Sequence, residues 1–409
     1  MVLRFNRRKI VMKINRAYKT ELDPNNKQIT HFIGACGMAR FVYNWALDYW
    51  IKEYERGDKR TGWMKLNTKL SELKQTEFTW MYDYSNWVRV YAMRDCDQAY
   101  QNFFRRVKQG NKNPGFPKFK SKKHDKKSFT INGGEVKIKE TAVRLPKIEW
   151  IRLKEHGYIP VNSDKICYAT ISEENGRWYI SVTVEETIQE QEISDQIIGI
   201  DLGIKTLAVT SDGIYYENPK TLKKAEKRLK RLDRELSKKQ KGSKNREKAK
   251  IRRAKAYEKV ARIRKHILNE ITTELAKTKS IIAIENLNVA GMMQNHHLAR
   301  AIGDAGFGEF RRMLEYKCAW YGSKIIVIDR WYPSSKTCSN CGAINDNLTL
   351  NDRTFKCDCG LEIDRDLNAA INIKNTAKYA EINACGESVR PQSIAAVSVK
   401  QEAGIGSYV

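Results

Sequence analysis

The sequence predicts a multidomain α/β protein that carries a small metal-binding insert. Three observations predict this class. The chain has 409 residues, which is more than one hydrophobic core usually organises, so we expect two or three domains. Apolar residues alternate with a period of two in some segments and recur at helical spacing in others. Four cysteines form two close pairs between residues 338 and 359.

The charge balance indicates a polyanionic partner. The chain has 75 Lys and Arg against 48 Asp and Glu, a net charge of +27. Such an excess favours nucleic acid, which binds cations through its phosphates with release of counterions. A membrane surface is the competing partner, but the positive charge is spread along the whole chain and is not gathered in one anchor.

The apolar runs are short. None approaches the ~20 residues that a membrane helix requires, so we expect a soluble protein with no membrane partner. No signal peptide opens the chain, and five further cysteines are scattered singly, which favours a reducing compartment such as the cytoplasm.

The N-terminal quarter predicts a strand followed by helices. Residues 1–18 alternate as a strand does, and Pro24 with Asn25 ends it. Apolar positions at helical spacing then make residues 28–108 mainly helical. Residues 108–127 contain glycines, prolines and many lysines. They predict either a loop over a phosphate backbone or a plain solvated linker, and the sequence alone slightly favours the linker.

Alternation returns between residues 128 and 186. Within it, Asn175-Gly176 separates two β-type runs, residues 166–171 and 178–184, which predicts a hairpin. We therefore expect a small β domain or barrel, which the N-terminal strand could complete.

The pattern changes at Ile197. Residues 197–201 form a buried-type strand, followed by a run at 207–210 and a turn at Asp212-Gly213. Two further strands are predicted at residues 281–285 and 324–328, with a helix around 310–320 between them.

Residues 220–265 predict a highly charged helical hairpin that breaks at Gly242-Ser243. Basic residues outnumber acidic ones there by about four to one. A merely solvated hairpin would be served by alternating charges, so this positive bias favours contact with nucleic acid.

The two cysteine pairs predict a zinc site. Cys338 and Cys341 have the spacing of a metal knuckle, whereas Cys357 and Cys359 are separated by a single residue and must form a tighter one. A glycine directly after each pair supplies the permissive backbone that such turns use. The competing interpretations are disulfides and unrelated core cysteines.

Three carboxylates occupy the ends of predicted elements. Asp201 ends one strand, Glu285 ends another, and Asp366 lies at the start of a helix predicted over 367–376. Each alone is typical of a turn or a helix cap. Together they could hold Mg²⁺, and two such ions would support in-line hydrolysis of a phosphodiester.

These motifs resemble the TnpB family of transposon-encoded nucleases. The resemblance rests on Ile200-Asp201-Leu202-Gly203, Ile284-Glu285-Asn286-Leu287 and Asp364-Arg365-Asp366 followed by Leu-Asn-Ala-Ala, with the cysteines between the second and third motifs. Residues 18–28, 39–44, 115–119 and 304–309 also resemble it, so the likeness covers all but the tail.

The resemblance implies a RuvC-type, ribonuclease H-like core with an inserted zinc ribbon, a wedge β-barrel domain and a helical recognition lobe. The expected boundaries are 1–20 and 128–195 for the wedge domain, 21–127 for the recognition domain, 196–330 and 361–379 for the nuclease domain, and 331–360 for the ribbon. Residues 380–409 lack periodicity, and we expect a poorly ordered tail there.

The resemblance also assigns residues. Asp201, Glu285 and Asp366 would be the catalytic ligands of Mg²⁺. The four zinc ligands would be Cys338, Cys341, Cys357 and Cys359. Asp364 is the rival third acid, but Asp366 directly precedes the Leu-Asn-Ala-Ala stretch, where the family has its catalytic aspartate.

The function that the resemblance implies is RNA-guided cleavage of DNA. The partners would be a guide RNA from the transposon end and double-stranded target DNA with a short flanking motif, bound by a monomer in the prokaryotic nucleoid. Arg40, Lys118 and Lys120 lie in motif-like segments and could contact nucleic acid, although a solvated surface explains a lone cation equally well.

Three alternatives stay open from the sequence. A relative that binds RNA and DNA without cutting would act as a repressor or transposition regulator. A compact type V CRISPR effector would have much the same core. A strand-joining transposase could use the same acids, but the ribbon between the second and third acid argues against it.

Overall fold

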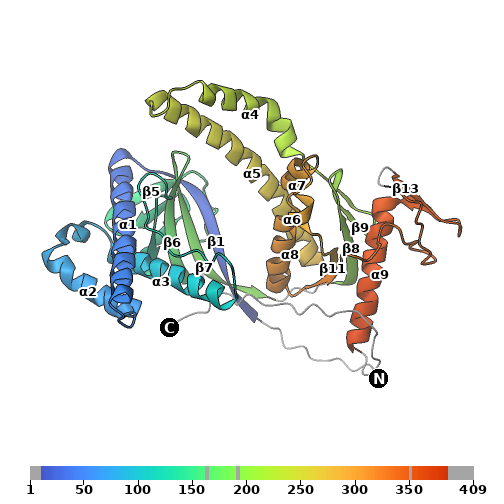
Figure 1. Ribbon diagram of the computed structural model, residues 1–409, viewed down its shortest axis with the longest axis horizontal. Helices are drawn as coiled ribbons and strands as arrows, with labels where there is room; N and C mark the ends of the chain where they lie inside the picture. Colours follow the sequence, from blue (N-terminus) through green and yellow to red (C-terminus); the bar gives the residue numbers. More distant parts are fainter. Residues whose placement is uncertain (1–10, 162–164, 190–193, 350–351, 386–409) are drawn as a thin grey trace. The chain divides into compact units, whose positions relative to one another are not determined.

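The structure is a computed structural model that describes residues 11–161, 165–189, 194–349 and 352–385 (Figure 1). The chain forms two compact units. The first contains Met1–Glu190 and Lys227–Lys259, and the second contains Gln191–Glu226 and Val260–Val409. None of the helices in the described part of the chain combines the length and apolar character that a bilayer crossing requires.

The first unit is built on a seven-stranded antiparallel sheet. The strand order is β2-β6-β7-β1-β5-β4-β3. The strands are β1 (Val11–Asp23), β2 (Ser128–Asn132), β3 (Lys137–Lys139), β4 (Ala142–Leu145), β5 (Ile148–Leu153), β6 (Lys165–Glu174) and β7 (Arg177–Gln189). The order starts at β2 and ends at β3, so the described residues form a sheet with two edges, and its closure into a barrel stays a prediction.

Helices share the core of this sheet. They are α1 (Asn26–Glu55), α2 (Trp63–Thr76) and α3 (Asn86–Lys108), with the 3₁₀ turns η1 (Thr79–Asp83) and η2 (Gly133–Glu135). Phe32 of α1 packs against Phe129 of β2 and Trp178 of β7, with ring centroids 5.9 and 5.0 Å apart. Helices and sheet therefore bury one continuous core, and the division into a wedge and a recognition domain stays a prediction.

Two local signals in this unit fix the ends of its elements. Asn25 caps α1 by accepting a hydrogen bond from the Gln28 amide, and the Gln28 side chain accepts one from Asn25, which is a capping box. Asn175 and Gly176 have φ values of 54° and 77° and form the predicted turn between β6 and β7.

The second unit contains a five-stranded mixed sheet in the order β10-β9-β8-β11-β12. Its strands are β8 (Ser194–Leu202), β9 (Thr206–Thr210), β10 (Tyr215–Glu217), β11 (Lys279–Glu285) and β12 (Lys324–Ile328). β8, β11 and β12 are parallel, and β9 and β10 are antiparallel to their neighbours. A small two-stranded sheet joins β13 (Thr354–Lys356) to β14 (Glu362–Asp364).

The helices are α4 (Thr221–Ser237), α5 (Lys244–Thr278), α6 (Val289–Met292), α7 (Ala299–Ala305), α8 (Phe307–Tyr321) and α9 (Arg365–Cys385). Helix α8 and the C-terminal part of α5 pack on one face of the five-stranded sheet, and α9 covers the other (Figure 1). The predicted charged hairpin is α4 and α5, and it turns at residues 238–243 as expected.

Helix α9 is longer than predicted. It continues to Cys385, so residues 380–385 are helical and do not belong to a disordered tail. These residues carry no apolar repeat, and they extend a helix whose earlier turns are packed on the sheet. Residues 386–409, the remainder of the predicted tail, lie outside the described residues.

The contact between α9 and the sheet depends on Gly199. A Cβ at this position of β8 would lie 2.1 Å from the Ala370 carbonyl oxygen and 2.4 Å from the Lys374 nitrogen. Only a residue without a side chain lets the backbone of α9 approach β8 this closely.

We expect Gly199→Ala to destabilise the second unit. The added methyl group must push α9 away from β8, which should lower the free energy of unfolding by about 1–3 kcal/mol. Gly308→Ala is the matched control, because a Cβ at Gly308 in α8 would meet nothing within 4 Å. Urea unfolding of both variants tests this, and equal stabilities would contradict the close contact.

Candidate active site and metal centre

The five-stranded sheet places Asp201 and Glu285 side by side. β8 and β11 run parallel with Ile200 opposite Ile284, so the next residues, Asp201 and Glu285, lie at the same end of the sheet. Side chains alternate between faces along each strand. Ile200 and Ile284 point into the core under α5 and α8, whereas Ala283 packs on the α9 side. Asp201 and Glu285 therefore belong to the α9 face.

Helix α9 brings Asp366 to the same place. Ala370 and Lys374 lie against Gly199, and Asp366 is one turn before Ala370, toward the end of β8 that carries Asp201. The electrostatic influence of both Glu285 and Asp366 on Asp201 shows that the three acids are neighbours.

Asp364 has a different role. Its Oδ1 accepts hydrogen bonds from the backbone nitrogens of Asp366 and Leu367, both at 3.0 Å. Asp364 is thus the N-cap of α9 and satisfies two of the free N–H groups at the helix start. This geometry fits the interpretation of Asp364 as a cap, whereas the Asp366 carboxylate pairs with Arg365 Nη2 at 3.2 Å.

Glu285 and Asp366 add to the cost of ionising Asp201. Burial, followed by the charges of Glu285 and Asp366, raises the pKa of Asp201 to about 8, while Arg365 opposes the shift. Burial also raises the pKa of Glu285, although a hydrogen bond from Ser334 lowers it. Carboxylates in such a place ionise together only when cations lie between them.

The donor set fits Mg²⁺. Carboxylate oxygens with open positions are the ligands that this ion takes. The carboxylate oxygens of the three acids are not all within 4.8 Å of one another. Within the described residues, only the four cysteines form a group of three or more His, Cys, Asp or Glu that meets this condition. A set of acids wider than this leaves room for the ion's own waters and for a substrate oxygen.

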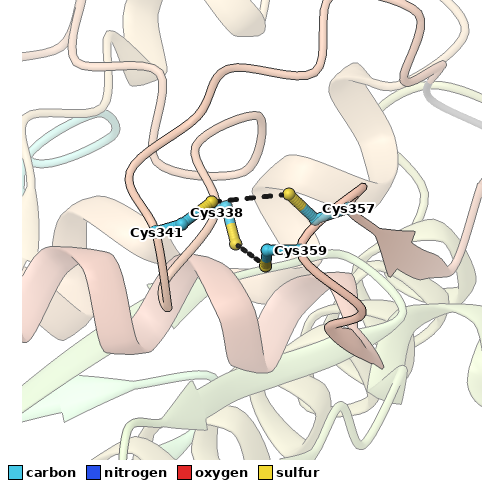
Figure 2. Close-up of side chains that lie close together, drawn as sticks. All are labelled: Cys338, Cys341, Cys357 and Cys359. Atoms are coloured by element: carbon cyan, nitrogen blue, oxygen red, sulfur yellow. Dashed lines mark hydrogen bonds between the residues drawn. The ribbon is translucent and has the colours of Figure 1, made fainter.

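The four predicted zinc cysteines meet at one point (Figure 2). Cys338 Sγ lies 3.6 Å from Cys359 Sγ, and Cys341 Sγ lies 3.6 Å from Cys357 Sγ. A zinc ion with Zn–S bonds of about 2.3 Å places tetrahedral sulfurs about 3.8 Å apart. The observed spacing fits this value and is far beyond the ~2 Å of a disulfide.

The surroundings of Cys359 favour its thiolate. A backbone hydrogen bond from Cys359 lowers the pKa of Cys357, but desolvation and hydrogen bonds with the other three cysteines raise it to about 12. The Leu361 backbone N–H and the Asn340 side chain donate to Cys359 and lower its pKa to about 6. The single-residue spacing of Cys357 and Cys359 is accommodated by Gly360, which has a φ of 87°. Zinc binds the deprotonated sulfur, so this chemistry matches the prediction from the cysteine spacing.

The three predicted nucleic-acid contacts occupy different settings. Arg40 and Lys120 line one hollow of the first unit, together with Asp95 and Asp125. Asn44 holds the backbone of Lys120 through two hydrogen bonds of 2.8 and 2.7 Å. Lys118 is exposed and is not part of this lining. The structure brings two of the three together, and their contact with nucleic acid stays a prediction.

Sequence analysis missed three polar residues around the acids. Ser334 donates a hydrogen bond to Glu285 Oε1. Asn368 and Asn372 of α9 are 0% and 3% exposed and bind the backbone that precedes Cys338. A signal existed for the asparagines: they are four residues apart, on a helix face shared with buried Ala369 and Ile373.

Three family models match the chain. The OrfB_IS605 model, described as "Probable transposase", matches residues 169–296. The Cas12f1-like TNB domain matches residues 307–373, and the OrfB_IS605 helix-turn-helix domain matches residues 12–59.

Relatives match nearly the whole chain. A protein of Streptomyces pristinaespiralis named "Putative RNA-guided DNA endonuclease" is 35% identical over 96% of this chain and 97% of its own. InsQ of Escherichia coli (strain K12), which carries the same description, is 31% identical over 93% of this chain and 96% of its own. Among solved structures, a Cas12f1–sgRNA–target DNA complex matches with a TM-score of 0.56 at 17% identity, covering 86% of this chain and 83% of the other.

The sheet with its acidic end and the cysteine cluster define an α/β protein of the OrfB class encoded by transposable elements. Given the 35% identity over almost its full length, the chain belongs to the TnpB family.

Zinc should be required for the ribbon. We expect about one zinc ion per chain in the purified protein, and Cys357→Ser should remove it and lower the unfolding temperature. Cys167→Ser is the control, because Cys167 lies in β6 of the first unit and is not one of the four clustered cysteines, and serine can keep its contact with Asn15. Elemental analysis and thermal unfolding check this; full zinc content in Cys357→Ser would contradict the assignment.

The pH dependence of stability should follow Asp201. Its folded pKa is about 8 and its unfolded value about 4. Between these values the Mg²⁺-free folded protein holds a proton that the unfolded chain has released, so stability falls as pH rises. Relative to Asp201→Asn, the wild type should lose free energy of unfolding from about pH 5 to about pH 8, and Mg²⁺ should reduce the loss. Parallel urea-unfolding curves for the two proteins would contradict the shift.

Proposed function

We propose that the chain is an RNA-guided DNA endonuclease associated with a transposable element, and that it cleaves DNA by Mg²⁺-dependent phosphodiester hydrolysis. The main observation that supports this is the convergence of Asp201, Glu285 and Asp366 at one end of the sheet, on the face that α9 covers. The names of the full-length relatives support the same activity.

The fold supports a RuvC-like core. Three antiparallel strands lead into two further strands that run parallel to β8, with acids at the ends of β8 and β11 and a third on the helix behind them. The cysteine cluster between Glu285 and Asp366 then corresponds to a zinc ribbon inserted in this core. The seven-stranded sheet and its helices would supply the wedge domain and the recognition lobe.

In the proposed mechanism, the three carboxylates hold the catalytic cations. Bound Mg²⁺ would supply an activated water and stabilise the oxygen that leaves the phosphodiester. Asp201 must lose its proton to take part, and its neighbours make that loss unfavourable without a cation. Ser334 restrains Glu285 through its hydrogen bond. Asp364 caps α9 through its hydrogen bonds to the first turn and takes no part in holding the cations.

The hairpin of α4 and α5 supports contact with nucleic acid. Residues 221–265 contain 21 Lys and Arg and five Asp and Glu. The five acids are engaged within the protein: Glu226 with Arg300, Asp233 with Arg253, Glu235 with Arg231, Glu247 with Lys250, and Glu258 with Asn175 and Tyr179. The pairing consumes few of the cations, which leaves a basic surface suited to phosphates. We place guide RNA and target DNA there and at Arg40, Lys118 and Lys120, with one RNA per monomer.

Removing Asp366 should abolish cleavage and leave binding intact. The protein would be purified with its guide RNA and tested on a matching plasmid with Mg²⁺. Asp366→Ala should cut at least about 100-fold more slowly, because it removes a ligand worth several kcal/mol in the transition state. It should still bind the target, because Asp366 is proposed only as a metal ligand and its ion pair with Arg365 lies within the protein.

Asp364→Ala is the matched control. It should cost about 0.5–2 kcal/mol of stability through loss of the cap and retain cleavage while folded. Equal cleavage by the two variants would contradict the assignment of Asp366. Tight RNA-guided binding without cleavage by the wild type would instead favour the repressor alternative.

A further inference from the structure

A short segment connects the two metal sites. Residues 329–339, here the connecting segment, begin after β12 and end in the first cysteine knuckle. Near its middle, Ser334 is 5% exposed, and its hydroxyl donates to Glu285 Oε1. A loop that only connected two elements would not need a buried serine. Here the buried serine faces Glu285, one of the three proposed catalytic acids.

Helix α9 holds the connecting segment from the other side. Asn372 Nδ2 donates to the carbonyl oxygens of Ser334 at 2.8 Å and Thr337 at 2.6 Å. Asn368 Nδ2 donates to the Thr337 carbonyl oxygen at 2.7 Å, and its Oδ1 accepts from the Ser339 nitrogen at 3.0 Å. Both amides are buried, so water does not compete for these bonds. The helix that carries Asp366 thus also fixes the backbone of Ser334.

We propose that Ser334 is a positioning residue for Glu285, and that Asn372 acts through Ser334 by fixing its backbone. This inference rests on the proposed function, because it concerns the Mg²⁺ ligands of that site. A glutamate has several rotatable bonds, and one fixed hydrogen bond to Oε1 leaves Oε2 directed for a cation. The hydrogen bonds of Ser334 and Asn372 link Glu285 of β11 to α9, the helix that carries Asp366. The two proposed ligands therefore keep a fixed position relative to each other although they come from different elements.

A purely structural role for the segment makes a different prediction. If Ser334 and Asn372 only attached the ribbon to α9, their loss would lower stability or zinc content without changing the affinity for Mg²⁺. The discriminating quantity is therefore the concentration of divalent cation that the site requires, measured on folded protein with its zinc retained.

Ser334→Ala tests whether the Ser334 hydroxyl positions Glu285. In the full chain with its guide RNA, the Mg²⁺ concentration for half-maximal cleavage should rise about 10- to 100-fold, as is usual when a partner of a metal ligand is lost. Ser334→Thr keeps the hydroxyl and should restore most of the effect. Ser335→Ala is the matched control, because within the described residues no hydrogen bond joins the Ser335 side chain to Asp201, Glu285 or Asp366.

A second readout avoids cleavage. Mn²⁺ binding to the same complexes would be followed by electron paramagnetic resonance, with the Glu285→Gln complex subtracted as the background from RNA and other sites. Ser334→Ala should weaken the remaining binding by the same 10- to 100-fold. Asn372→Asp, which replaces the donor amide by an acceptor, should shift both quantities in the same direction, whereas Asn375→Asp on the same helix should not.

The outcomes separate the two proposals. Unchanged half-maximal Mg²⁺ and unchanged Mn²⁺ binding in Ser334→Ala overturn the positioning role. A lower maximal rate or unfolding temperature at unchanged cation dependence also overturns it and assigns a structural role. Weaker Mn²⁺ binding in Ser334→Ala, with no guided cleavage by the wild type under any condition, supports the positioning of Glu285 and overturns the proposed nuclease function.

Discussion

The packing of α9 on β8 is the contact on which the site depends. The sheet alone supplies two acids, because the parallel register of β8 and β11 places Asp201 beside Glu285. The third acid, Asp366, reaches this place only if α9 lies directly on β8. Gly199 permits that packing because it leaves no side chain between the two backbones. The core then completes the fit, since Ile373 and Ala377 of α9 pack with Ala283 and Ile328 of the sheet. A site made of mutually repelling groups is thus fixed by apolar packing behind it.

This packing brings together carboxylates whose negative charges repel one another. Burial and two like charges make an ionised Asp201 unfavourable, which is why its pKa rises to about 8. The fold tolerates the cost because Gly199, the α9 core and the cap at Asp364 hold the elements irrespective of the charge state. A bound cation would relieve this repulsion, so the proposed affinity for Mg²⁺ would originate in the same constraint that makes an ionised Asp201 unfavourable.

Sequence patterns predicted those parts of the structure that depend on local rules. The apolar runs before Asp201 and Glu285 indicated strands, and alternation along a strand explains why both acids face α9. Asn175-Gly176 predicted its hairpin because few other pairs adopt positive φ twice in succession. The cysteine spacing predicted that the four thiols meet, even with the irregular second pair.

Tertiary hydrogen bonds left no such signal. Ser334 is one serine in a polar run, and its importance arises from the fold, which brings residue 334 to residue 285. The last turns of α9 lack a periodic pattern because propagation from a packed helix needs none. The roles of the surface cations leave the least signal in the sequence. Lys120 differs from Lys118 only because Asn44 fixes its backbone and its ammonium lies 3.9 Å from the centre of the Tyr43 ring.

The placement of the zinc cluster follows from the same geometry. In the sequence it separates Glu285 from Asp366, and in space its first knuckle begins at the segment that Asn368 and Asn372 bind. An insert at this point must return the chain so that α9 starts at the end of β8, because otherwise Asp366 would miss the other acids. Four thiolates on one zinc ion would fix both ends of the insert with few residues, which a loop of this length could not achieve through a hydrophobic core of its own. The cluster therefore returns the chain to the sheet, so that Asp366 lies beside Asp201 and Glu285 although it is distant from them in the sequence.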